Sequence, residues 1–234
     1  MSYGKLYLIP TPLGDYSPET VLPAAVLSIL PGLKVFVVEE TRTARRFLSA
    51  AGLKGRISDL RFHELNEHTD PKSVDGLIHL FEDGDVGLMS EAGLPAVADP
   101  GALLVAACHR HGIEVVPLTG PSSLMMALMA SGLNGQSFAF CGYIPAKTDE
   151  RRKALAAIER RSCQERQTQI LIETPYRNDS LLADILAVCR PGTRVCIAAD
   201  ITLPSEFIRT KTVSGWKKDV PVIGKRPCVF LLLG

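Results

Sequence analysis

The sequence lacks the features that mark secreted, membrane-spanning and strongly basic nucleic-acid-coating proteins. Its six cysteines are scattered without a C-x-x-C pair, and several lie in apolar runs, so we expect reduced, buried thiols. No stretch approaches the ~20 apolar residues that cross a bilayer, and the N-terminus is too short and too polar for a signal peptide. With 26 Lys and Arg against 25 Asp and Glu, the net charge is +1, so any contact with RNA or DNA must come from a local patch. These absences predict a cytoplasmic protein with no membrane partner.

Common ligand and catalytic motifs are missing as well. No G-x-G-x-x-G follows a strand, no G-x-x-x-x-G-K-[ST] occurs, and Ser90 is wrongly spaced for a G-x-S-x-G nucleophile elbow. His63 and His68 are five positions apart, whereas two metal ligands on one helical face need a separation of four. We therefore expect no metal, and a site built largely from apolar and backbone groups. Such a site suits a neutral nucleoside-like ligand better than a triphosphate.

What the chain does have is a regular alternation of short apolar runs with helical patterns in its first half. The expected strands are 5–10, 34–40, 59–63, 85–90 and 113–118, and the expected helices are 18–30, 43–52, 70–84 and 101–112. Ser17 and Asp70 are expected helix N-caps ahead of prolines, and Gly52 and Gly112 are expected helix ends. Strands that are apolar on both faces and alternate with helices indicate a parallel sheet covered on both sides.

The pattern changes near residue 119. Expected helices at 124–132, 150–161 and 180–189 alternate with strands at 137–144 and 168–175, and three further strands follow at 193–201, 205–215 and 227–234. Consecutive strands without intervening helices indicate antiparallel or mixed pairing. We predict an α/β protein of two domains, 1–118 with a parallel sheet and 119–234 with a mixed sheet.

Four predicted strands end in loops rich in Gly, Pro, Ser or Thr. These loops are Ile9–Asp15, Ser90–Gly101, Pro117–Ser123 and Ile172–Arg177. In open α/β sheets ligands bind outside the carboxyl ends of the strands, and small residues there let the backbone approach a ligand closely. The alternative is that these residues only terminate the elements.

Polar candidates stand beside these loops. Glu39, Glu40 and Arg42 close the second strand, and Glu173 and Arg177 follow a later one. Carboxylates beside arginines at strand ends can orient a substrate or act as a general base. Alternatively, Glu39 or Glu40 pairs with Arg42 or caps the next helix.

A basic helix is expected over Asp149–Arg161, which contains five Lys and Arg residues. A solvated helix face is the usual explanation of such a pattern. The other interpretation is a contact with RNA phosphates.

Taken together and in order, the loops resemble the tetrapyrrole-methylase superfamily of S-adenosylmethionine-dependent methyltransferases. Within it the chain looks most like a divergent, short member of the bacterial 16S ribosomal RNA 2'-O-ribose methyltransferases, which modify a cytidine of the decoding region. The resemblance covers nearly the whole chain and is carried by the segments LYLIPTPLGD, VVEETR, ELNEHT, SEAGLPAVADPG, VVPLTGPSSLMMALMASGL, FCGYIPAKTDERRKAL and LIETPYR.

The resemblance implies a homodimer of two-domain chains, each holding S-adenosylmethionine in a cleft between its domains. The small residues at the matching positions are consistent with a cofactor held largely by backbone groups. The implied cofactor-binding residues are Pro12, Leu13, Gly14, Ser90, Glu91, Ala92, Gly93, Leu94, Pro95, Gly120, Pro121, Ser122, Ser123, Ile172 and Ala198.

The resemblance also implies a substrate side that consists of Glu40, Arg42, His68, Glu173 and Arg177, facing 16S rRNA or the small ribosomal subunit. Methyl transfer from a sulfonium needs an oxygen nucleophile held in line, and a ribose hydroxyl benefits from a group that accepts its proton. We expect Glu40 to be that group, and Arg42 and Arg177 to contact RNA phosphates.

Several positions depart from the family pattern. Glu91 stands where Asp is usual, Leu94 where Thr is usual, and Glu40 where the second acid is Asp. Ile172 and Tyr176 replace a Tyr and a His. Two further interpretations stay open: the same fold acting on a tetrapyrrole, a protein side chain or a small metabolite, and a non-catalytic S-adenosylmethionine-binding module.

Overall fold

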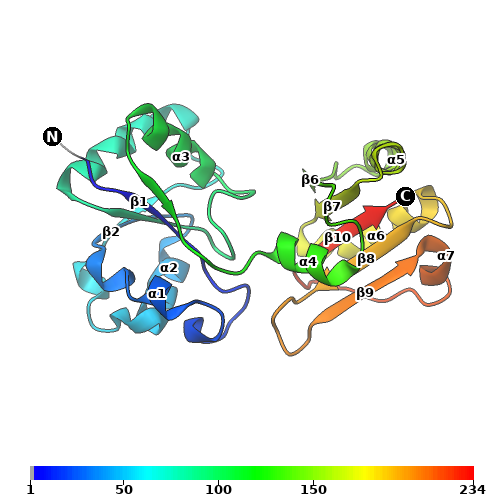
Figure 1. Cartoon of the computed structure of the whole chain (residues 1–234), viewed down its shortest axis with the longest axis horizontal. Helices are drawn as coiled ribbons and strands as arrows, with labels where there is room; N and C mark the ends of the chain where they lie inside the picture. The colour runs from blue at the N-terminus through cyan, green and yellow to red at the C-terminus, as the bar shows by residue number, and fades with distance from the viewer. Residues whose placement is uncertain (1–2) are drawn as a thin grey trace. The chain divides into compact units, whose positions relative to one another are not determined.

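The computed structural model describes residues 3–234. The chain divides into two compact units, unit 1 up to Ser122 and unit 2 from Ser123 to Gly234 (Figure 1). Each unit contains a five-stranded sheet with helices packed on it. The predicted α/β class, with one parallel and one mixed sheet, is confirmed.

The sheet of unit 1 is entirely parallel, in the order β3-β2-β4-β1-β5. Its strands are β1 Leu6–Ile9, β2 Val35–Val38, β3 Arg61–Glu64, β4 Val86–Met89 and β5 Val115–Pro117. Alternate residues of β2 enter two different hydrophobic clusters: Val35 and Val37 join one, and Phe36 and Val38 join the other. The central strands are thus buried on both faces, as their unbroken apolar runs predict.

Helices and short helical turns connect these strands. They are α1 Ala24–Leu27, α2 Thr41–Leu48 and α3 Gly101–Arg110, with the 3-10 or π segments η1 Pro18–Thr20, η2 Leu30–Gly32, η3 Ser49–Leu53, η4 Ile57–Asp59 and η5 Pro71–Asp83. The expected helix over 43–52 corresponds to α2 and η3, and that over 101–112 corresponds to α3. Asp70 caps η5 as expected, because its side chain accepts a hydrogen bond from the Lys72 N–H at 3.0 Å.

The helix predicted over 18–30 is broken. The Ser17 side chain makes no capping hydrogen bond, only a 3-10 turn follows it, and the α-helix begins after Pro23. Proline has no N–H and disfavours a helical conformation in the preceding residue, so the two helical pieces do not join. The segment predicted as a helix over 70–84 is also 3-10 in form, with Gly76 in its interior lowering α-helix propensity.

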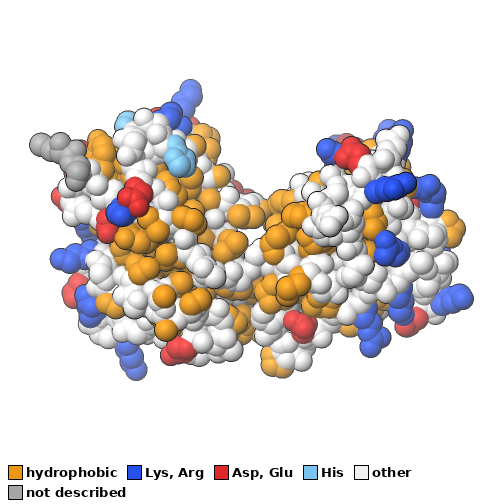
Figure 2. Space-filling model, in the orientation of Figure 1, with side chains coloured by type: hydrophobic (Ala, Val, Ile, Leu, Met, Phe, Trp, Pro, Cys, Tyr) orange, Lys and Arg blue, Asp and Glu red, His pale blue; other side chains and the backbone are white. Residues whose placement is uncertain are grey.

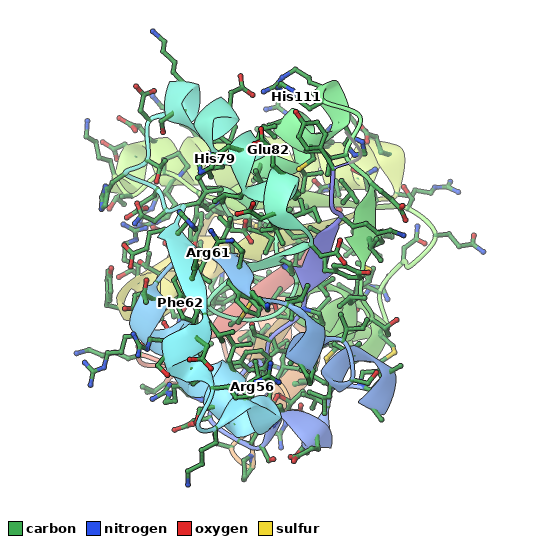
Figure 3. All side chains as sticks on the ribbon, turned by 90° about the vertical axis from the view of Figure 1, so that its left-hand side faces the viewer. Arg56, Arg61, Phe62, His79, Glu82 and His111 are labelled. Carbon is green, nitrogen blue, oxygen red and sulfur yellow. The ribbon has the colours of Figure 1, made fainter. Side chains whose placement is uncertain are left out.

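Strand β3 lies at one edge of the parallel sheet, where Figure 3 shows Arg61 and Phe62 along it. The Phe62 ring stacks on that of Phe36 with 5.9 Å between centroids, and the exposed Arg61 pairs with Asp83 at 3.2 Å. A charged side chain on an edge strand disfavours pairing with a strand of another chain.

The sheet of unit 2 is mixed, in the order β6-β7-β10-β8-β9, with β6 and β7 parallel and the other neighbours antiparallel. Its strands are β6 Phe138–Tyr143, β7 Thr168–Ile172, β8 Arg194–Ala199, β9 Phe207–Thr212 and β10 Cys228–Leu233. Its helical segments are α4 Ser123–Ser131, α5 Thr148–Glu165, η6 Pro175–Arg177, α6 Asn178–Val188 and α7 Val213–Trp216. The expected strand over 205–215 ends at Thr212, whose hydroxyl caps α7 by accepting a hydrogen bond from the Gly215 N–H.

Two arginines of the basic helix α5 form ion pairs with another helix of unit 2. Arg151 is buried and donates to Asp184 of α6 at 2.6 Å, and Arg152 donates to the other oxygen of the same carboxylate at 2.7 Å. Burial alone would raise the pKa of Asp184, but the bonds from Arg152 and Arg151 lower it below its ordinary value. Arg151 is therefore neither solvated nor free for RNA, unlike the exposed Lys153 and Arg160.

The two units differ in charge, which the total of +1 conceals. Unit 1 has 10 Lys and Arg against 15 Asp and Glu, a net charge of −5. Unit 2 has 16 Lys and Arg against 10 Asp and Glu, a net charge of +6. Figure 2 shows several of these basic side chains grouped on the visible face of unit 2. Unit 2 thus has the positive field that favours a polyanionic partner.

The buried Asp184 gives a stability prediction. Replacing it in Asp184→Asn leaves the Arg151 guanidinium buried without a charged partner, so we expect a loss of roughly 3 kcal/mol in the free energy of unfolding. Urea denaturation followed by circular dichroism measures it. Asp219→Asn is the matched control, because this exposed carboxylate pairs with Lys211 at 2.8 Å and its loss is expected to change the midpoint little. Equal shifts in the two variants would contradict the structural role of Asp184.

Candidate functional site

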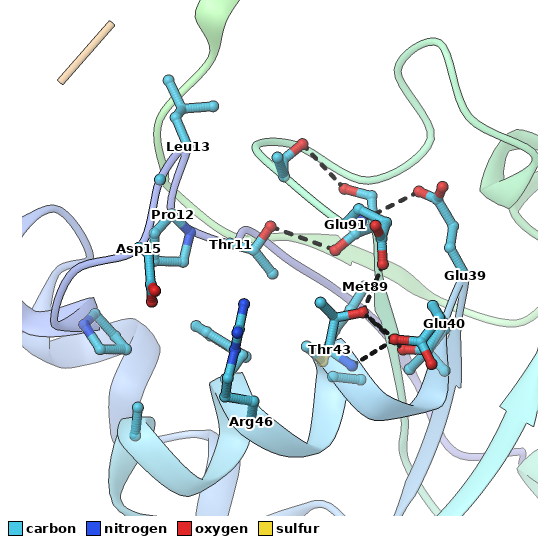
Figure 4. Close-up of a pocket in the computed structure, with 18 of the residues that line it drawn as sticks. Thr11, Pro12, Leu13, Asp15, Glu39, Glu40, Thr43, Arg46, Met89 and Glu91 are labelled. Atoms are coloured by element: carbon cyan, nitrogen blue, oxygen red, sulfur yellow. Dashed lines mark hydrogen bonds between the residues drawn. The ribbon is translucent and has the colours of Figure 1, made fainter. Parts of the chain in front are cut away.

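A pocket opens in unit 1 at the carboxyl ends of β1, β2 and β4 (Figure 4). Its volume is about 280 Å³. Three segments form most of its wall: the loop after β1, the end of β2 with helix α2, and the end of β4. Because the carboxyl ends of parallel strands meet at one edge of a sheet, segments far apart in sequence contribute to the same pocket.

Glu40 caps helix α2 at the edge of this pocket. Its carboxylate accepts hydrogen bonds from the Arg42 N–H at 2.8 Å and the Thr43 N–H at 2.7 Å. A hydrogen bond from the Thr43 hydroxyl, followed by these two backbone bonds, lowers the pKa of Glu40. The capping interpretation of this residue is confirmed.

Thr43 joins this helix to the loop after β4. Its hydroxyl oxygen lies 2.5 Å from Oε2 of Glu40 and 2.5 Å from Oε1 of Glu91, as Figure 4 shows. Glu91 lies in the loop after β4, and its carboxylate reaches the side chain of a residue on α2. One hydroxyl between two carboxylates thus ties this loop to the helix.

Glu39 is the half-buried carboxylate of the pocket. Burial, followed by repulsion from Asp99, raises its pKa to about 6, although a hydrogen bond from the Glu91 N–H at 3.3 Å opposes the shift. The pKa of Glu39 is thus raised while the pKa of the adjacent Glu40 is lowered. Neighbouring carboxyl groups with pKa values shifted in opposite directions are a common feature of acid–base sites.

The long loop over Ser90–Gly101 is an ordered structure. The Thr11 N–H donates to the Gly93 carbonyl at 2.9 Å and the Gly93 N–H donates back at 3.1 Å, which pairs this loop with the loop after β1. Gly93 has a φ of +79°, a conformation that glycine adopts without strain. Ala96 and Ala98 also have positive φ values, of 65° and 61°. Backbone strain of this kind clusters at functional sites.

Asp99 ends this loop and starts helix α3. Its two carboxylate oxygens accept hydrogen bonds from the Ala96 N–H at 2.8 Å and from the Gly101 N–H at 2.6 Å. Burial raises the pKa of Asp99, while these backbone bonds oppose the shift. The Asp99–Gly101 end of this loop therefore forms a turn and leads into the start of α3.

The loop after β5 packs closely on the loop after β1. A Cβ atom on Gly120 would come within 2.1 Å of the Pro10 side chain, so only glycine fits there. Pro121 is buried and Ser122 is partly exposed.

Of the predicted residues of unit 2, Ser123 begins helix α4, and the others lie in and after two strands of the sheet. Ile172 ends β7 and is partly exposed, whereas Ala198 is fully buried in β8. Glu173 has a buried side chain, and its Oε1 accepts hydrogen bonds from Nε of Arg177 at 2.9 Å and from Nη2 at 2.5 Å. Within residues 3–234, Oε2 of this carboxylate has no hydrogen-bond partner.

The structure brings some of the predicted residues together in the pocket of unit 1. Those that line it are Pro12, Leu13, Gly14, Glu40, Ser90, Glu91 and Ala92. Arg42 lines a second hollow, beside Glu40 and Arg46. The pocket lining does not include His68, an exposed residue that lies 3.7 Å from Glu67, nor the remaining predicted residues.

Sequence reasoning missed several residues of the pocket. Thr11, Thr43, Arg46 and Phe47 line it, and the last three lie on helix α2. A signal was available, because Thr43, Arg46 and Phe47 are spaced by three and four positions and so share one helix face.

Neither a metal centre nor a membrane span is found in the described part of the chain. No three or more His, Cys, Asp or Glu side chains within residues 3–234 are grouped so that they could hold a metal ion. No helix in this range is long and apolar enough to cross a bilayer.

Comparison with known proteins identifies the family. Residues 5–215 match the family described as Tetrapyrrole (Corrin/Porphyrin) Methylases. A protein of Neisseria meningitidis serogroup B, named Ribosomal RNA small subunit methyltransferase I, is 35% identical over 211 residues, which are 90% of this chain and 68% of that protein. A protein of the same name from Escherichia coli O157:H7 is 34% identical over 222 residues, which are 93% of this chain and 73% of that protein.

Solved structures agree on the fold. The methyltransferase CobJ superposes with a TM-score of 0.65 at 16% identity, covering 99% of this chain and 94% of its own. Uroporphyrin-III C-methyltransferase from Thermus thermophilus, solved with S-adenosylhomocysteine, gives 0.57 at 18% identity, with 98% and 97% coverage. The family match and the curated relatives together show that this chain belongs to the tetrapyrrole methylase family of S-adenosylmethionine-dependent methyltransferases.

Proposed function

We propose that this methyltransferase modifies a ribose 2'-hydroxyl of 16S ribosomal RNA. The observation that carries the proposal is the similarity, over about nine-tenths of the chain, to proteins named Ribosomal RNA small subunit methyltransferase I. The net charge of +6 on unit 2 supports a polyanionic substrate.

The residues present fit S-adenosylmethionine. When bound, the cofactor supplies an electrophilic methyl group on a positively charged sulfur. Carboxylates of the pocket stabilise positive charge, and the segments Pro12–Gly14 and Ser90–Ala92 contribute to its wall. We propose that the loop residues implied by the family resemblance, from Pro12 to Gly14, Ser90 to Pro95 and Gly120 to Ser123, hold the cofactor. Ile172 and Ala198, which the resemblance also implies, stay predictions.

Glu39 is our choice for the group that accepts the ribose proton. Of its neighbours, Glu40 uses its carboxylate to cap α2, which lowers its pKa and its strength as a base. Glu39 lines the pocket, and its pKa of about 6 makes it the stronger base while leaving it ionised at neutral pH. The earlier expectation for Glu40 stays a prediction, and the same measurement decides between them.

The same features disfavour an acidic tetrapyrrole as substrate. Glu39, Glu40, Glu91 and Asp15 all line the pocket, and unit 1 has a net charge of −5. A ligand that carries several carboxylates would be repelled there.

A homodimer, which the resemblance implies, stays a prediction that light scattering on the purified protein tests.

Deleting the gene in its host is the direct test of the RNA substrate. We expect one 2'-O-methyl group to disappear from 16S rRNA, as mapped by mass spectrometry of nuclease fragments. Re-expression of the intact chain should restore it. An unchanged set of 2'-O-methyl sites after deletion would exclude this substrate.

Glu39→Gln tests the proton acceptor. We expect kcat/KM for methyl transfer to fall by roughly 100-fold, because a positioned base contributes about 10²–10⁴. In the parent protein kcat/KM should rise with pH through about 6 and then level, since Glu39 acts only when deprotonated. Glu40→Gln is the matched variant. Loss of the pH step in that variant, with the step retained in Glu39→Gln, would transfer the role to Glu40.

The stability of the Glu39→Gln variant should move the opposite way to its activity. A raised pKa means that the folded chain holds this proton more tightly, so ionisation costs folding free energy above pH about 6 and nothing below the ordinary value of 4.5. Allowing for its half exposure, we expect the variant to gain about 1 kcal/mol at pH 8 and nothing at pH 4. Thermal or urea denaturation at the two pH values measures the gain. A variant that loses stability at pH 8 would contradict the raised pKa.

A further inference from the structure

Two exposed tyrosines lie near Arg177 on unit 2. Tyr143, the last residue of β6, is 60% exposed, and Tyr176 in the turn after β7 is 73% exposed. Tyr143 is the register partner of Ile172, and the residue after Ile172 is the carboxylate that holds Arg177. Two aromatic rings and one guanidinium group therefore lie together where two neighbouring parallel strands end.

Glu173 holds the guanidinium group of Arg177 in place. Nε and Nη2 of Arg177 both donate to the single oxygen Oε1 of Glu173. The bond from Glu173 raises the pKa of Arg177, and the nearby Tyr176 and Tyr143 contribute in the same direction. The arginine is thus ionised and oriented, with its side chain one-third exposed to solvent.

Two exposed lysines lie near this group. Asn178, the next residue along the chain, donates to the carbonyls of Gly224 at 3.1 Å and Arg226 at 2.7 Å, which places the exposed Lys225 beside the start of α6. Lys147 follows β6, is also exposed and pairs with Glu150 at 3.4 Å. These cations belong to the unit whose net charge is +6.

We propose that Tyr143, Arg177 and Tyr176 form a stacking site for unpaired nucleotides of an RNA strand. The bases stack on the tyrosine rings, and Arg177, held by Glu173, donates to a phosphate. Aromatic rings bind bases of any sequence, while the cations follow the backbone, which is the way single strands are held without sequence preference. The inference rests on the proposed RNA substrate but concerns binding, which needs no methyl transfer.

Fluorescence anisotropy with a labelled, single-stranded RNA of about twelve nucleotides tests the site. We expect Tyr143→Ala and Tyr176→Ala each to weaken binding roughly tenfold, the cost of losing one stacked base. Tyr176→Phe should bind like the parent chain, because it keeps the ring. Tyr3→Ala is the matched control, because Tyr3 is an exposed tyrosine of unit 1, and it should leave the RNA affinity unchanged.

Salt dependence separates stacking from phosphate contact. Arg177→Ala should reduce the slope of log affinity against log salt by about 1, whereas the tyrosine variants should weaken binding without changing the slope. Unchanged affinity in both tyrosine-to-alanine variants would overturn the stacking site. If light scattering shows in addition that these variants no longer self-associate, the rings belong to a protein interface instead.

The RNA-binding test and the gene-deletion test can succeed or fail independently of each other. If the deletion leaves rRNA methylation unchanged but the tyrosine variants lose affinity for the oligonucleotide, the methylated target is wrong and the stacking site stands. If methylation is lost on deletion but the tyrosine variants bind RNA normally, the target stands and the stacking site is wrong.

Discussion

The crowding of three carboxylates at the carboxyl edge of the parallel sheet is the constraint on which the site depends. Glu39, Glu40 and Glu91 come from the ends of β2 and β4, and like charges so close together destabilise the fold unless hydrogen bonds offset their repulsion. The start of α2 supplies those bonds: its free N–H groups donate to Glu40, and the single hydroxyl of Thr43 lies 2.5 Å from Glu40 and 2.5 Å from Glu91, where it can donate to either carboxylate. Among the described residues, Glu39 accepts one backbone bond, from the Glu91 N–H at 3.3 Å, and keeps a raised pKa. The start of α2 therefore stabilises the charge of Glu40 and leaves that of its neighbour Glu39 less stabilised.

The sequence pattern predicted the sheets well because strands that are buried on both faces consist of apolar residues. Continuous apolar runs such as Val35–Val38 occur in strands covered on both faces, and their alternation with helices indicates parallel order. Helix type was less predictable. Pro23 breaks a segment whose apolar spacing fits one helix, and the 3-10 form of η5 has no clear counterpart in its hydrophobic pattern. Helix caps such as Asp70 were predictable, because the capping side chain accepts a hydrogen bond from a residue close to it in the sequence.

Contacts between segments distant in sequence were beyond prediction. Nothing in the spacing of Arg151 and Asp184 shows that α5 and α6 meet, so a buried ion pair looked like part of a solvated or RNA-binding face. Likewise, the role of Thr43 depends on the loop after β4 lying against α2. Charge was different, because the opposite signs of the two units are present in the sequence and are hidden only when the whole chain is summed. Dividing the count at the domain boundary makes the basic unit visible.

The division of charge bears on which groups the pocket suits. Unit 2 attracts anions, whereas the carboxylates of the pocket repel them and attract the positively charged sulfonium of S-adenosylmethionine. Glu91 contributes one of the negative charges of the pocket. Its carboxylate also contacts Thr43, a residue with its own bond to Glu40, and so links the loop after β4 to helix α2. The same side chain therefore contributes both to the electrostatics of the pocket and to the anchoring of its wall.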